Sequence, residues 1–122
     1  MKILVIEDEE VLAKVFEEKL KRAHYEVEIA SDGEAGLVKA RLKPNMIVLD
    51  LVLPKRDGFS VLKELKGDEE LKLIPVVVVS NLGEDSDIKR ALELGAVDYF
   101  VKAQHPINEI VEKVKNILIV GN

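Results

Sequence analysis

Residues 46–58 read Met-Ile-Val-Leu-Asp-Leu-Val-Leu-Pro-Lys-Arg-Asp-Gly and join an apolar run to a single carboxylate. Four successive apolar residues, Met46–Leu49, leave no polar face, which is typical of a strand buried on both sides of a parallel sheet. Asp57 stands where a helix would begin, because its side chain can accept a hydrogen bond from a free N–H group of the first turn. The stretch therefore predicts a strand, a loop and a helix, with Asp50 at the carboxyl end of the strand.

The same unit recurs along the chain. Apolar or alternating runs predict strands at residues 2–6, 25–30, 46–49, 74–79 and 98–101, and helical periodicity predicts helices at about 9–22, 33–42, 58–66, 85–94 and 106–119. This alternation predicts a doubly wound α/β fold, in which a five-stranded parallel sheet carries helices on both faces. The length of 122 residues favours a single domain over residues 1–122.

Polar residues and glycine mark the ends of the predicted helices. Asp32 and Asp57 stand at or near helix starts, and Asp85 or Ser86 is expected to cap the helix at 85–94. Gly95 follows that helix, where a residue in the left-handed conformation commonly ends one. The end signals therefore agree with the periodicity.

Composition excludes several classes of function. The chain has no cysteine, so it has neither a disulfide framework nor a thiolate metal site. A net charge of −5 argues against direct binding of nucleic acid, whose phosphates are held by clustered Lys and Arg, and favours a protein partner. No apolar run approaches the length of a membrane span and no cleavable signal precedes the first strand, so we expect a cytoplasmic protein that does not enter a membrane.

Polar side chains follow the predicted strands. Glu7 and Asp8 end the first strand, Asp50 ends the third, Ser80 the fourth and Lys102 the fifth. Singly, Glu7 and Asp8 could place charge near a helix N-terminus, the hydroxyl could bond to a turn and the lysine could reach solvent. Asp50 is harder to explain in this way, because burial after an apolar strand penalises its charge. Because the carboxyl ends of parallel strands share one edge of a sheet, where such folds bind ligands, we expect all five side chains to lie together.

Three carboxylates at one edge repel one another and call for a divalent cation. Oxygen ligands without His or Cys favour Mg²⁺, so Glu7, Asp8 and Asp50 are the candidate magnesium ligands. If Asp50 attacks phosphorus, the transferring group needs positive charge and a hydroxyl donor on its oxygens. Lys102 and Ser80 can supply them beside the metal at Asp8. The product would be an aspartyl phosphate.

These motifs resemble the response-regulator receiver domain over the whole chain. The resemblance is carried by Asp8 after Ile-Leu-Val-Ile, Asp50 before Leu-Val-Leu-Pro54, Asp57-Gly58, Ser80 after four valines, and residues 95–102, Gly-Ala-Val-Asp-Tyr-Phe-Val-Lys. It implies a flavodoxin-like sheet of order 2-1-3-4-5. It also implies a signalling switch rather than an enzyme, one that catalyses only its own phosphorylation and dephosphorylation.

The resemblance assigns further roles. Asp50 would accept phosphoryl from the phosphohistidine of a histidine kinase or phosphotransfer protein, with the Val52 carbonyl as an additional Mg²⁺ ligand. Ser80 and Tyr99 would form the switch pair that remodels a face for a downstream protein partner, or for a homodimer formed on phosphorylation. That face comprises the predicted elements 85–94, 98–101 and 106–119.

Five positions depart from the usual pattern of the family. Glu7 replaces a more usual Asp, Asn81 replaces a small residue, and Ala103 stands where a cis proline is usual. Val52 and Leu82 are apolar at positions that flank the phosphoryl group. Because a cis bond at a non-proline residue costs about 2.5–4 kcal/mol, we expect a trans bond before Ala103.

Three alternatives remain. One is a phosphorylation-independent interaction module with the same fold, which the complete set of Asp8, Asp50, Ser80 and Lys102 disfavours. A haloacid-type phosphatase would need an acid where Val52 stands. A flavodoxin-like flavin carrier would need a phosphate loop rich in Ser, Thr and Gly after the first strand, where acidic residues would repel phosphate.

Overall fold

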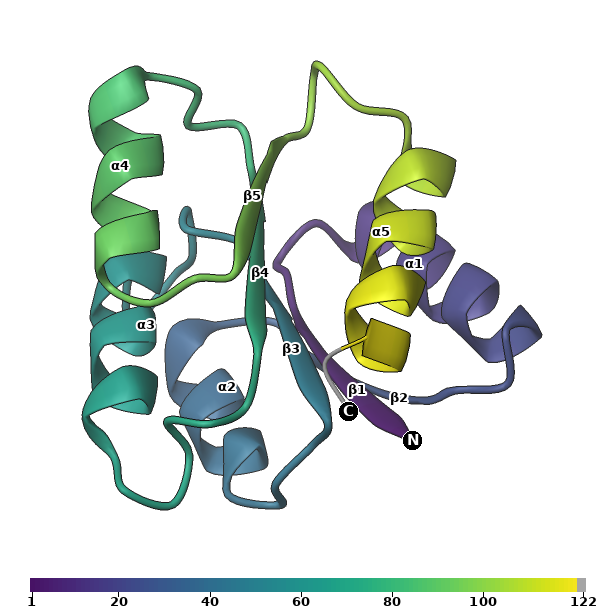
Figure 1. Ribbon diagram of the computed structural model, residues 1–122, viewed down its shortest axis with the longest axis horizontal. Helices are drawn as coiled ribbons and strands as arrows, with labels where there is room; N and C mark the ends of the chain where they lie inside the picture. The colour runs from purple at the N-terminus through teal and green to yellow at the C-terminus, as the bar shows by residue number, and fades with distance from the viewer. Residues whose placement is uncertain (121–122) are drawn as a thin grey trace.

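The computed structural model describes residues 1–120, in which strands and helices alternate (Figure 1). The elements are β1 (Lys2–Ile6), α1 (Glu10–Arg22), β2 (Glu26–Ala30), α2 (Gly33–Ala40), β3 (Met46–Leu49), α3 (Gly58–Gly67), β4 (Val76–Ser80), α4 (Asp85–Glu93), β5 (Asp98–Val101) and α5 (Ile107–Val120). All strand pairs are parallel, and the order is β2-β1-β3-β4-β5. The predicted doubly wound fold and strand order are confirmed. The domain limits of 1–122 stay a prediction, and their last two residues lie outside the described part.

Helices cover both faces of the sheet. In Figure 1, α2, α3 and α4 lie on one side of the strands, and α1 and α5 lie on the other. The four valines of β4 face both layers, since Val76 and Val78 belong to one apolar cluster and Val77 and Val79 to the other. No helix within residues 1–120 is long and apolar enough to cross a bilayer.

The helix ends follow the predicted pattern with one exception. Asp32 accepts the Ala35 N–H group at 2.7 Å, and Asp57 accepts the Ser60 N–H group at 3.1 Å. Gly95 follows α4 with φ +112°, a conformation that favours glycine.

The predicted cap of α4 is wrong. Asp85 and Ser86 lie inside the helix, because the extended residue before it is Glu84, whose side chain makes no capping hydrogen bond in the described chain. Asp85 instead places negative charge in the first turn, where the helix dipole favours it.

The fourth strand begins and ends later than residues 74–79. Pro75 precedes it, and Ser80 is its last residue, paired in register with Val101 of β5. Ser80 is fully buried as a result. The ladder therefore continues to the edge where the polar side chains lie.

Candidate functional site

Backbone hydrogen bonds bring the polar ends of the strands together. The Asp50 N–H group donates to the Ile6 carbonyl at 3.0 Å, so Asp50 lies beside the residue that follows β1, Glu7. The Lys102 N–H group donates to the Ser80 carbonyl at 2.9 Å and aligns β5 with β4 in the same way. The predicted grouping of these side chains at one edge of the sheet is confirmed.

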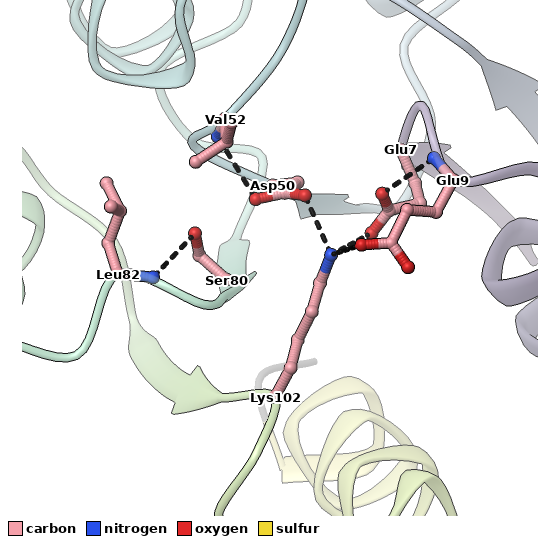
Figure 2. A network of polar contacts seen from close by, with 7 residues as sticks. All are labelled: Glu7, Glu9, Asp50, Val52, Ser80, Leu82 and Lys102. Atoms are coloured by element: carbon pink, nitrogen blue, oxygen red, sulfur yellow. Dashed lines mark hydrogen bonds and ion pairs between the residues drawn. The ribbon is translucent and has the colours of Figure 1, made fainter.

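Lys102 is the centre of the site (Figure 2). Its ammonium nitrogen lies 2.8 Å from Glu7 Oε1 and 2.8 Å from Asp50 Oδ2. Glu7 is 3% exposed and Asp50 is 4% exposed, so both carboxylates are nearly removed from solvent. A third carboxylate, that of Glu9, places Oε1 at 3.4 Å from the same nitrogen. The lysine thus connects two buried acids and one exposed acid.

Backbone N–H groups orient the other oxygen of each buried carboxylate. The Glu9 N–H group donates to Glu7 Oε2 at 3.0 Å, and the Val52 N–H group donates to Asp50 Oδ1 at 3.1 Å. Every oxygen of Glu7 and Asp50 therefore accepts a hydrogen bond, two of them from Lys102. Both carboxylates are therefore fixed in orientation by the protein itself.

Burial and charge act in opposite directions on the ionisable groups. Burial raises the pKa of Glu7 to about 7, although hydrogen bonds from Lys102 and from the Glu9 N–H group favour its carboxylate form. Burial alone would lower the pKa of the Lys102 ammonium. The hydrogen bonds and negative charges of Asp50 and Glu7 outweigh it and raise that pKa above its ordinary value. Lys102 therefore stays charged at neutral pH.

The acidic cluster has the composition of a site for a divalent cation. Glu7, Asp8 and Asp50 each offer an oxygen, and these oxygens lie within 4.8 Å of one another. Asp8 is exposed, so the cluster opens to solvent on that side. Carboxylate oxygens are hard ligands, and one ammonium leaves the cluster with net negative charge. These residues fit a divalent cation.

Ser80 and Tyr99 both contact Leu82. The Leu82 N–H group donates to Ser80 Oγ at 3.3 Å, and the Tyr99 hydroxyl donates to the Leu82 carbonyl at 2.5 Å. Tyr99 is 9% exposed, and burial, together with the charge of Asp87, raises the pKa of its phenol to about 12. The two predicted switch residues are therefore linked through the backbone of one residue between them.

Gly58 is required behind Asp50 because a side chain there would collide with the backbone. A Cβ atom on Gly58 would lie 2.5 Å from the Asp50 carbonyl oxygen and 2.4 Å from Leu51 Cα. The Gly58 N–H group also donates to the Leu51 carbonyl at 2.9 Å. Only glycine permits this approach of α3 to the loop after β3.

The structure bears on three of the positions that depart from the usual family pattern: Ala103, Val52 and Leu82. Peptide bonds across residues 1–120 are all trans, so the expectation for the Lys102–Ala103 bond is confirmed. Val52 is 55% exposed beside Asp50, whereas Leu82 is partly buried in the apolar layer under α4. Sequence reasoning missed the contact of Glu9 with Lys102 and treated that acid only as charge near a helix start.

Comparisons with known proteins agree with this geometry. A family model described as the response regulator receiver domain matches residues 3–115. The alkaline phosphatase synthesis transcriptional regulatory protein PhoP of Bacillus subtilis (strain 168) is 42% identical over 118 residues, which is 96% of this chain and 48% of PhoP. The chain thus spans about half the length of the curated relatives it matches.

Solved structures extend the similarity to the fold. The Mn²⁺-bound form of response regulator Rcp1 is 32% identical with a TM-score of 0.82, over 95% of this chain and 90% of that one. The phosphorylated cyanobacterial phytochrome response regulator RcpA is 31% identical with a TM-score of 0.88, over 99% and 95% of the two chains.

A parallel doubly wound sheet with an acidic cluster and a lysine at its carboxyl edge defines a class of phosphoacceptor signalling modules. The chain belongs to the response regulator receiver domain family, the phosphoacceptor part of two-component systems. Receiver domains bind a divalent metal at their acidic pocket, and the cluster of Glu7, Asp8 and Asp50 occupies that place here.

Proposed function

We propose that Asp50 accepts a phosphoryl group from the phosphohistidine of a histidine kinase or phosphotransfer protein. The observation that carries the proposal is the buried Asp50 carboxylate, 2.8 Å from the Lys102 ammonium and within the cluster completed by Glu7 and Asp8. A buried carboxylate with these neighbours suits transfer of a charged group better than it suits structural support. Apolar residues at these positions would give the fold equal or greater stability, because burying charges is costly.

The transfer exchanges one bond for another. An Asp50 oxygen attacks phosphorus, an oxygen–phosphorus bond forms, and the bond between phosphorus and the donor imidazole nitrogen breaks. The imidazole leaves with the bonding electron pair and takes up a proton. Lys102 and Ser80 neutralise and hydrogen-bond the phosphoryl oxygens, and this stabilises the charge of the transition state. The domain catalyses only this step and the later hydrolysis.

The metal in this proposal is Mg²⁺. Glu7, Asp8 and Asp50 would hold it through carboxylate oxygens, and Val52 would add its backbone carbonyl. The bound ion would supply positive charge to the phosphoryl oxygens. Asp8 would be the exposed ligand, and Asp8→Asn should weaken Mg²⁺ binding by at least about 10- to 100-fold, the loss that removing even a hydrogen-bond partner of a metal ligand typically causes. Calorimetric titration tests this, and unchanged affinity would exclude Asp8 as a ligand.

Phosphorylation would act on the face formed by α4, β5 and α5. Ser80 and Tyr99 are the proposed switch pair, and their shared neighbour Leu82 supports a coupling between them. This face would then bind a downstream protein partner, or a second copy of the chain to form a homodimer, without direct contact of this domain with nucleic acid. Family membership also leads us to propose a cytoplasmic location.

Mass spectrometry tests the assignment of Asp50. The chain is incubated with acetyl phosphate and Mg²⁺, and wild type is compared with Asp50→Asn. The expected result is one added phosphoryl group on wild type and none on the variant. A wild type that gains no phosphoryl group supports the alternative, an interaction module that signals by binding alone. Phosphorylation of the Asp50→Asn variant would show that another residue is the acceptor.

A further inference from the structure

Glu9 lies at the start of α1 but does not act as its cap. Its backbone is extended, with φ −74° and ψ 104°, as expected of the residue before a helix. The side chain nevertheless caps no N–H group of α1 within the described chain. Figure 2 shows it directed toward the ammonium of Lys102, where Oε1 lies 3.4 Å from the nitrogen. The Glu9 side chain therefore contacts Lys102, which is distant in sequence, instead of capping its own helix.

Glu9 also contacts the metal ligand itself through its backbone. The Glu9 N–H group holds Glu7 Oε2 at 3.0 Å, while Glu7 Oε1 binds Lys102 at 2.8 Å. One residue therefore contacts both partners of the Glu7–Lys102 ion pair. The exposed fraction of the Glu9 side chain is 56%, against 3% for Glu7, so Glu9 meets the ammonium on the solvent side of the site.

The Lys102 ammonium contacts two of the three carboxylates that could also bind a metal ion. Lys102 binds Glu7 Oε1 and Asp50 Oδ2, and both of these carboxylates belong to the acidic cluster. Two cations a few ångströms apart repel each other strongly in a partly buried site. Lys102 must therefore weaken its hold on Glu7 when a divalent cation binds that carboxylate, and it then needs another anion within reach.

We propose that Glu9 is a positioning residue that retains the Lys102 ammonium at the edge of the site when a divalent cation takes the Glu7 carboxylate. The inference rests on the proposed metal site. An exposed acid beside the ammonium replaces the negative charge that Lys102 loses when the metal takes Glu7, so the ammonium keeps two acidic neighbours in a partly buried site. It also keeps Lys102 beside Asp50, where the phosphoryl group would arrive. Glu9 thereby favours metal binding without being a metal ligand.

A simpler explanation is that Glu9 only adds negative charge near the metal. Glu10 provides the matched control, because it is an exposed acid adjacent in sequence and lines the same surface pocket as Glu7 and Asp8. Charge alone predicts similar effects for Glu9→Gln and Glu10→Gln, whether or not Lys102 is present. Retention of the ammonium predicts that only the Glu9 effect depends on Lys102.

A double-mutant cycle separates the two explanations. Mg²⁺ affinity is measured by calorimetry for wild type, Glu9→Gln, Lys102→Gln and the double variant, and Glu10→Gln is made in both backgrounds. Glu9→Gln should weaken binding about three- to fivefold in the wild-type background, the size expected of a partly exposed ion pair. In the Lys102→Gln background the loss should fall below about twofold. Equal losses in both backgrounds would overturn the inference.

A second readout needs no change at Lys102. Mg²⁺ is added to wild type, Glu9→Gln and Glu10→Gln, and the NMR signals of the Lys102 ε-methylene group are followed. The chemical shifts of this group at saturating Mg²⁺ should differ between wild type and Glu9→Gln but coincide between wild type and Glu10→Gln. Coincidence of all three contradicts the role of Glu9. A wild type that binds no Mg²⁺ would contradict the proposed metal site and this inference with it.

Discussion

Helices α3 and α4 lie on the same face of the sheet but are attached to it very differently. The Asp57 side chain caps α3, and five of its residues are buried, including Val61 and Leu62. Glu84 makes no capping hydrogen bond to α4, in which only Ala91 is buried among the residues described. The two helices therefore lie in the same layer, but α3 is packed against the sheet far more extensively than α4.

The difference between the two helices follows the roles that we propose for the residues before them. Helix α3 follows the loop after Asp50, and Gly58 packs directly against the Asp50 carbonyl. Helix α4 follows Ser80 and Leu82, the residues linked to Tyr99. Elements with few buried contacts open at lower free energy than deeply packed ones. A well-packed helix thus lies behind the proposed acceptor Asp50, and a weakly packed helix follows the proposed switch residue Ser80.

The largest expected effect comes from removing one leucine from each helix. Leu62 on α3 is fully buried, so Leu62→Ala should lower the free energy of unfolding by about 2–5 kcal/mol through lost burial and a cavity. Leu92 on α4 is 45% exposed, so Leu92→Ala should change it by no more than about 0.5 kcal/mol. Urea unfolding measures both. Equal losses would show that α4 is anchored as firmly as α3.

The lifetime of the phosphorylated state tests the loops that precede the two helices. Val52 before α3 and Leu82 before α4 cannot hydrogen-bond a water molecule for attack on phospho-Asp50, and we expect both to obstruct it. Val52→Asn/Leu82→Glu should therefore lose phosphoryl roughly 10- to 100-fold faster, at or below the low end of the about 10²- to 10⁴-fold that a positioned acid–base group typically contributes.

Radiolabelled phosphoryl loss at fixed Mg²⁺ measures this lifetime. Val97→Asn, an exposed change remote from the phosphoryl site, is the control and should decay like wild type. If the double variant decays no faster than wild type, apolar shielding is not what sets the lifetime.

The ends of the two helices should respond in opposite directions. Asp57→Ala removes the hydrogen bond to the Ser60 N–H group and should destabilise the domain by about 1 kcal/mol. Glu84→Ser introduces a side chain that suits the first position of α4 and should stabilise it by about 0.5 kcal/mol. Thermal unfolding of both variants checks the signs. A destabilised Glu84→Ser variant would mean that Glu84 has a partner other than its helix.

Much of the site was predictable because it depends on strand ends. Apolar runs end at Ile6, Leu49 and Val101, so the polar residues that follow them had to meet at one edge of a parallel sheet. The direction of Glu9 was not predictable in this way. It depends on Lys102, 93 residues away in sequence, and on α1 beginning at Glu10. Contacts of this kind follow from the assembled fold rather than from any local pattern.

The weak attachment of α4 was not predictable from a local sequence pattern either. The contact of Arg90 with α3 provides the test with the smallest expected effect. The Arg90 guanidinium lies 4.1 Å from the centre of the Phe59 ring of α3, which connects the two helices directly.

Arg90→Gln removes the cation and should destabilise the domain by only about 0.5–1 kcal/mol, as expected of an exposed cation–π pair. Because only one residue of α4 is buried among those described, hydrogen exchange should accelerate more in α4 than in α3. Lys89→Gln is the matched control, since this neighbouring exposed cation pairs only at 3.9 Å with Glu93 of its own helix. Equal acceleration in both variants would show that charge on α4, and not the contact with Phe59, holds the helix in place.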